Sequence, residues 1–315
     1  MALAWPLVVA RLVLFASLLV LFGASLFFLY GLDPAAQGAA ARRDAWPRRM
    51  LAASAGVGLL ASVGWLVAET ASLMGQSLLR IDWASLRAVA AQTRFGQITL
   101  ARIGLLAGAL ILTQVLRGSR TLWAYVAALG GVAAASFAWT GHGSLGEGAG
   151  RLVHLTGDIV HLWAAGTWLG ALVPLGMLVY GSSAIQAPPH LRSVAYSLER
   201  FSGIGTAVVA VLLLSGLINT GYVIGLSRWR EIFTTVYGRL LILKLALFAA
   251  MLMLAAVNRY RLSPRLRNAL EESTPTAGAL QGLRRTVVLE TCLGLAVLAA
   301  IALFGALEPP VSGSP

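Results

Sequence analysis

Long apolar runs separated by short polar connections dominate the chain. In the apolar run 153–180, Gly166 and Gly170 lie one helical turn apart, which predicts the close approach of a neighbouring helix. In the connection 79–90, apolar residues recur at helical intervals with charges on the other faces, which predicts a short amphipathic helix at the membrane surface. The pattern predicts an all-α integral membrane protein, with 1–315 as a single polytopic domain and 308–315 as a disordered tail. Its eight predicted transmembrane helices are 8–30, 51–74, 97–116, 121–141, 153–180, 204–225, 238–257 and 286–307.

Composition agrees with this pattern. Hydrophobic residues make up 58% of the chain and charged residues only 11%, less than half the fraction of about 25% in soluble domains. The mean hydropathy is +0.80. No phosphate-binding loop and no nucleophile–base arrangement is present, so we do not expect an enzyme.

The net charge of +12 follows the predicted topology. With eight spans, four connections share one side and hold more than half of the 24 Lys and Arg residues: 31–50, 117–120, 181–203 and 258–285. The positive-inside rule places that side in the cytoplasm and both termini in the periplasm. Basic runs interleaved with aromatic residues are absent, so we expect a lipid bilayer and no nucleic acid as partner. His190 and Pro264 fall in the cytoplasmic connections, where we expect solvated loop and little helix.

A short motif occurs twice along the chain. The first copy is Thr93-Arg-Phe95-Gly96 with Arg102 six residues further on, and the second is Thr235-Val-Tyr237-Gly238 with Lys244. Identical spacing at the start of the third and seventh spans predicts two four-helix repeats, 1–141 and 151–307. An even number of spans in each gives the two repeats the same orientation, as in transporters built from parallel repeats.

Two histidines and a carboxylate interrupt the fifth run. His154 and His161 are seven residues apart, and Asp158 lies between them on the same helical face. Ionisable side chains at membrane depth are costly and mark functional sites by default. His142 ends the fourth span at the same surface, so we expect His142, His154 and Asp158 to share a metal ion, with His161 as a second station about 10 Å deeper. Imidazole suits copper and zinc; the alternative is that these histidines are buried and satisfied by neighbouring hydroxyls, carbonyls or Asp158.

Two further candidate ligands lie near the outer end of the second span. Glu69 would complete a cation site or relay protons, or alternatively it would form an ion pair with Arg102 or Lys244, which enter the membrane from the same side. Met74 carries a thioether, a soft ligand suited to Cu(I), although core packing is the ordinary role of a methionine.

An ordered set of short stretches, spread over roughly residues 60–260, resembles a known family. The stretches are His161-Leu-Trp-Ala-Ala-Gly-Thr-Trp168-Leu-Gly170, Gly141-His142, Arg200-Phe201-Ser202, Ser215-Gly216, Tyr237-Gly238-Arg239 with Lys244, and Thr93-Arg-Phe95-Gly96 with Arg102. They resemble the copper resistance protein D (CopD) family. On this resemblance His142 and His161 stand at family positions, whereas His154 and Glu69 rest on geometry alone.

The resemblance implies a protein of copper homeostasis in the bacterial inner membrane that moves copper, as Cu(I) or Cu(II), from periplasm to cytoplasm. It also implies a small periplasmic copper-binding partner (CopC-like), for which no connection of this chain is long enough to be a fused copy. Two other functions fit the residues. One is an electron-transfer protein with haem held between intramembrane histidines, and the other is a non-transporting membrane anchor for a periplasmic copper protein.

Overall fold

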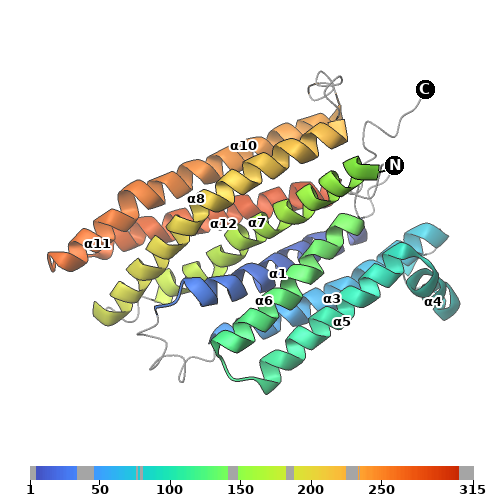
Figure 1. The fold of residues 1–315 in the computed structure, drawn as a ribbon, viewed down its shortest axis with the longest axis horizontal. Coiled ribbons are helices and arrows are strands. Elements are labelled where there is room, and N and C mark those ends of the chain that lie inside the picture. Colours follow the sequence, from blue (N-terminus) through green and yellow to red (C-terminus); the bar gives the residue numbers. More distant parts are fainter. Residues whose placement is uncertain are drawn as a thin grey trace.

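The computed structural model consists of packed helices (Figure 1). It describes residues 5–33, 46–75, 77–78, 81–140, 148–181, 188–224, 233 and 235–304. Eight helices in these ranges are long and apolar enough to cross a membrane, which confirms the predicted all-α fold with eight transmembrane helices. The α-helices are α1 Trp5–Tyr30, α3 Trp46–Met74, α4 Trp83–Gln92, α5 Arg94–Val115, α6 Arg120–Ala135, α7 Gly148–Gly181, α8 Pro188–Ile224, α10 Val236–Val257, α11 Ser263–Glu271 and α12 Ala277–Phe304, with a 3-10 turn η2 at Ser136–Trp139 and a π-helix η4 at Asn258–Leu262.

Helix α1 is, with the span formed by α6 and η2, the most enclosed of the eight, and α10 is the most peripheral. In the most apolar window of α1, 61% of the residues are buried, against 6% in that of the span formed by α10, η4 and α11. Helix α1 packs against α3, α6, α7 and α12, so it joins the first four spans to the last four. A helix that is apolar on every side suits either a protein core or lipid, and the sequence of α10 fits the second environment.

The crossing of α1 and α7 brings the two backbones into contact. Gly23 of α1 faces Gly166 and Gly170 of α7, and a Cβ atom added at Gly170 would lie 2.8 Å from the Cα atom of Gly23. Carbon atoms in contact are about 3.5–4.0 Å apart, so a side chain at this position does not fit. This contact confirms the close approach predicted from Gly166 and Gly170.

The duplicated motif has the same local structure in both copies. The Thr93 hydroxyl accepts a hydrogen bond from the Gly96 N–H at 3.0 Å, and the Thr235 hydroxyl accepts one from the Gly238 N–H at 3.0 Å. Each threonine thereby caps the first turn of its helix, α5 or α10. The motif explains why both spans begin where they do, while the duplication of the whole half stays a prediction.

Two connections expected as loops are helical instead. Helix α8 begins at Pro188, so His190 lies half-buried in its first turn and not in a solvated loop. Helix α10 continues through η4 into α11, where Pro264 occupies the first turn. The Ser263 N–H donates to the Asn258 carbonyl five residues earlier, so the chain makes a wider turn just before the proline.

The ends of the spans define two opposite faces of the bundle. Helix α1 begins and α12 ends at the same face, together with the start of α7 and the end of α3, while α11 lies at the other (Figure 1). The predicted amphipathic segment forms α4 beside the end of α3, and the Asp82 carboxylate caps it by accepting from the Ser85 N–H at 2.7 Å. Which face meets the periplasm stays a prediction from charge.

Candidate metal site on helix α7

Helix α7 carries the predicted histidine stripe, and α8 packs along it. His154, Asp158 and His161 lie on one face of this 34-residue helix, with His161 about 10 Å further along the axis than His154. The start of α7 stands at the bundle face that also holds the start of α1, so His154 is near that face and His161 deeper (Figure 1). The structure therefore arranges the two histidines as two levels and not as one site.

His154 is buried between α7 and α8. Its ring is 5% exposed and stacks on Tyr222 of α8, with ring centroids 5.1 Å apart and an angle of 8° between the planes. Its Nε2 atom is 3.7 Å from Oδ2 of Asp158, too far for a hydrogen bond but close enough for attraction when the imidazole is protonated. The predicted pairing of His154 with Asp158 is present in this form.

His161 has a hydrogen-bond partner that fixes its chemistry. Its Nδ1 atom is 3.0 Å from the Ser215 hydroxyl oxygen, and the same hydroxyl donates to the Val211 carbonyl at 2.6 Å. Since a hydroxyl has one hydrogen, and that hydrogen goes to Val211, the oxygen accepts a hydrogen bond from Nδ1–H. The neutral imidazole then has its lone pair on Nε2, the atom that would coordinate a metal.

Glycines allow α8 to come this close to α7. A Cβ atom added at Gly157 would lie 2.8 Å from Oδ1 of Asn219, and one added at Gly216 would lie 3.5 Å from Cε1 of His161. A side chain at position 157 would have to displace the end of the Asn219 side chain, whereas Gly216 leaves room for ordinary van der Waals contact. The interface that holds both histidines depends on small residues from each helix.

A lysine from α10, Lys244, interacts electrostatically with both Asp158 and His161, so its charge acts on both histidine levels. Asp158 is half-buried and interacts electrostatically with His154 and with Lys244. The ammonium group offsets the charge of a carboxylate that is largely removed from water. A metal ion bound by Asp158 would therefore have to compete with Lys244 for this carboxylate.

Glu69 forms an ion pair, but with a cation other than the two predicted. Its Oε2 atom is 4.0 Å from a guanidinium nitrogen of Arg11 in α1, and it accepts a hydrogen bond from the Trp65 indole N–H at 3.1 Å. The Arg11 guanidinium also lies over the Trp65 ring, 5.1 Å from its centroid. The prediction of Arg102 or Lys244 as partner was wrong, because the packing of α1 against α3 brings Arg11 closer to Glu69 than either.

Arg102 is fully buried in the same four-helix half. Its guanidinium lies over the rings of Phe137 and Trp65, at 4.5 and 5.5 Å from their centroids, and its Nε donates to the Ser136 hydroxyl at 2.8 Å. Aromatic faces attract a cation where water is excluded. This environment gives Arg102 a role in packing α5 against α3 and η2.

The remaining predicted ligands are not gathered around His154. Met74 is 45% exposed at the end of α3, in the other half of the bundle from α7, and His142 lies outside the described residues. Within the part of the chain that the structure describes, no group of three or more His, Cys, Asp or Glu side chains is positioned to hold a metal ion. His154 and Asp158 thus supply two members of the predicted outer site, and His142 as the third stays a prediction.

One buried acid was not predicted. Glu290 is 1% exposed in α12, and its Oε1 atom accepts a hydrogen bond from the Asn258 amide at 2.7 Å. It lies four residues inside the predicted last span. The same signal that singled out Asp158, an ionisable residue within an apolar run, would have found it.

Two family descriptions match successive parts of the chain. Residues 1–152 match "Copper resistance protein D-like, N-terminal domain", and residues 195–304 match "Copper resistance protein D". Together they cover most of the described helices. No solved structure matches the chain.

Similar proteins have names that refer to copper or to the inner membrane. Copper resistance protein D of Pseudomonas syringae pv. tomato is 35% identical over 308 residues, which cover 96% of this chain and 97% of the relative. Inner membrane protein YebZ of Escherichia coli (strain K12) is 30% identical over 328 residues, covering 98% and 99%. Copper transport protein CutJ of Bacillus subtilis (strain 168) is 30% identical over 178 residues, covering 56% of this chain and 29% of the relative.

Proposed function

Since the chain belongs to the copper resistance protein D family, we propose that it carries copper across the bacterial inner membrane into the cytoplasm. Copper-related membrane function agrees with the family and with the eight spanning helices. The inner membrane is supported by the similarity to YebZ. The direction of copper transport is inferred from the distribution of charge along the sequence. The copper-binding residues are inferred from the geometry of α7 and α8.

The observation that carries the proposal is the state of His161. A buried imidazole with Nδ1–H held by Ser215 presents Nε2 as a lone-pair donor inside the membrane. Neutral imidazole is a copper ligand, and a neutral ligand leaves the charge of the ion uncompensated. Without a carboxylate to compensate its charge, the ion would be held less tightly here than beside Asp158, which suits a relay within a transport path.

His154 and Asp158 form the first station for copper in this proposal, at the face where α7 begins. Their side chains supply one nitrogen and one carboxylate, 3.7 Å apart. His142, from the end of the fourth span, would bring a second imidazole to the same level. A periplasmic copper-binding partner resembling CopC would deliver the ion at this face.

The direction of transport rests on the distribution of charge. Most Lys and Arg residues belong to the connections at the α11 face, which the positive-inside rule assigns to the cytoplasm. The histidine levels then lie on the periplasmic side of the bundle. Copper would pass first His154 and then His161 on its way inward.

The test is cell-associated copper in a bacterial host that expresses the wild type or a variant at matched membrane levels. His161→Ala should lose the extra copper seen with the wild type, because the deeper station is removed. His190→Ala removes a histidine from the first turn of α8, at the end of that helix away from Ser215, and this variant should keep the extra copper. Wild-type copper uptake by the His161→Ala variant, or no uptake by the wild type over empty vector, would contradict the proposal.

A further inference from the structure

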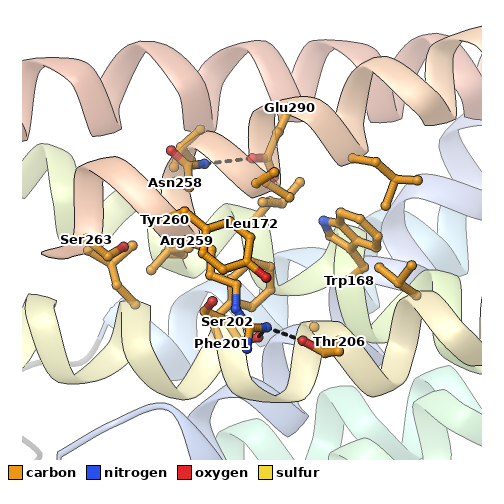
Figure 2. A pocket seen from close by; sticks show the side chains of 18 residues that line it. Trp168, Leu172, Phe201, Ser202, Thr206, Asn258, Arg259, Tyr260, Ser263 and Glu290 are labelled. Atoms are coloured by element: carbon orange, nitrogen blue, oxygen red, sulfur yellow. Dashed lines mark hydrogen bonds between the residues drawn. The ribbon is translucent and has the colours of Figure 1, made fainter.

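A cavity opens in the second half of the bundle, away from the histidines. It has a volume of about 210 Å³ and lies between α7, α8, α12 and the segment where α10 passes through η4 into α11 (Figure 2). This volume has room for several water molecules. Its lining includes Trp168, Thr206, Asn258, Arg259 and Glu290.

The cavity exists because α8 and α10 approach each other closely at few points. Both helices pack on other partners, α8 on α7 and α10 on α12. The Arg259 guanidinium spans the gap by donating to the Ser202 carbonyl at 2.9 Å and to the Thr206 hydroxyl. Its charge is therefore directed at the α8 wall of the cavity, opposite Glu290 (Figure 2).

Glu290 lies at the middle of α12, and only one of its two carboxyl oxygens accepts a hydrogen bond from the described residues. It is the fourteenth of the 28 residues of α12. The Thr286 hydroxyl lies 2.5 Å from Oδ1 of Asn258 and is also within hydrogen-bond distance of the Gly282 and Leu283 carbonyls, and the Asn258 amide nitrogen donates to Oε1 of Glu290 at 2.7 Å. Because Oε1 accepts from the Asn258 amide, Oε2 is the oxygen left to change its protonation state.

No cation neutralises this carboxyl group within the described ranges. Glu290 has no ion pair there, and its Oε2 atom accepts no hydrogen bond within 3.5 Å, although the Trp168 indole N–H points toward it. The other titratable groups lining the cavity are Arg259 and Tyr260, both from η4, and the lining residues of α7 and α8 carry none. Burial without a counter-charge favours the protonated acid, and water entering the cavity favours the ionised form.

The stripe on α7 connects this acid to the copper path. Trp168 follows His161 by seven residues, as His161 follows His154, so all three lie on one face at steps of about 10 Å. Trp168 is 5% exposed and lines the cavity beside Glu290. A movement of α7 at the histidines would therefore shift Trp168 and change the surroundings of Glu290.

We propose that Glu290 is a proton-binding station that exchanges a proton with water in this cavity and couples proton movement to copper movement. A hydronium ion in the cavity gives its proton to Oε2, an O–H bond forms there, and a neutral water remains; the reverse step releases the proton. The described residues that line the cavity include no imidazole, thiol or thioether, the side chains best suited to copper, so the ligand of this site is the proton and not the copper ion. The coupling rests on the proposed function, whereas proton binding itself does not.

Infrared difference spectroscopy on the purified protein tests proton binding without any transport. The carbonyl stretch of a protonated carboxylic acid, followed as the pH is changed, should show a titrating band in the wild type that is absent from Glu290→Gln. Glu271→Gln is the matched control, since Glu271 is exposed on α11 and pairs with Arg267 in water; it should keep the band. A Glu290→Gln spectrum identical to that of the wild type would overturn the proposal.

Proteoliposomes with a pH-sensitive dye inside test the coupling. Copper added outside should be taken up by the wild type together with a change in internal pH, and Glu290→Gln should lose the pH change while binding as many copper ions at equilibrium as the wild type. A Glu290→Gln variant that still moves protons with copper, or that binds fewer copper ions, would overturn the proposal. A wild type that moves no copper would reject the proposed function and the coupling together, and the infrared result would still decide proton binding.

Discussion

The contact between α1 and α7 gives the sharpest prediction about stability. In Gly170→Ala, the new Cβ atom would lie 2.8 Å from the Cα atom of Gly23 and would also meet the Leu19 carbonyl. Both obstacles are backbone atoms, which cannot rotate away. Restoring a carbon–carbon distance of about 3.5 Å requires the helices to separate by at least about 0.7 Å.

The expected loss of stability follows from overpacking. Inserting a methyl group into a tightly packed contact costs about 1–3 kcal/mol. At roughly 2–4 °C per kcal/mol, the melting temperature should fall by several degrees. Thermal unfolding of the purified protein in detergent, followed by loss of the monodisperse chromatographic peak, measures this shift.

Gly203→Ala provides the matched control. A Cβ atom at Gly203 meets nothing within 4 Å, and the change occurs in the interior of α8. Alanine is a better helix former than glycine by about 0.5–1 kcal/mol, so this variant should be as stable as the wild type or slightly more stable. A Gly170→Ala variant that melts at or above the temperature of Gly203→Ala would refute the assignment of a backbone contact here.

Two further substitutions separate the sites. Ser215→Ala removes the hydroxyl that holds Nδ1–H of His161 and should weaken copper binding about 10–100-fold, as measured by competition with a copper chelator; unchanged affinity would mean that the tautomer of His161 is set elsewhere. Glu69→Gln leaves Arg11 without its carboxylate and should lower the melting temperature while the number of copper ions bound at equilibrium stays the same, whereas the loss of one bound ion would show that Glu69 is a ligand.

The spans could be predicted from the sequence because lipid imposes a simple requirement. Backbone polar groups in a bilayer must bond within their own helix, so each crossing needs a long apolar run, and such runs are visible without any knowledge of packing. The Gly166 and Gly170 pair was predictable for a related reason, since small residues one turn apart have few other uses. Local spacing likewise sufficed for His154 and Asp158.

The partners of charged residues could not be predicted in the same way. Glu69 pairs with Arg11 because α1 lies in the centre of the bundle and packs on α3, and nothing in the order of the spans requires this. The continuity of α10 into α11 was also hidden, because it depends on a π-turn just before Pro264. Contacts between distant helices and changes in hydrogen-bond register are set by the fold as a whole.

The sparse contact between α8 and α10 has a mechanical consequence. Lipid tails are as apolar as the side chains on these helices, so moving the two apart would sacrifice little hydrophobic burial. Helix α10 has few neighbours besides α12, and the bonds from Arg259 to Ser202 and Thr206 tie it to α8. The two helices of this seam make few close backbone approaches, whereas α1 and α7 are in direct backbone contact at Gly23 and Gly170. Any opening toward the α11 face would therefore begin as a hinge of α10 against a fixed α1–α7 pair.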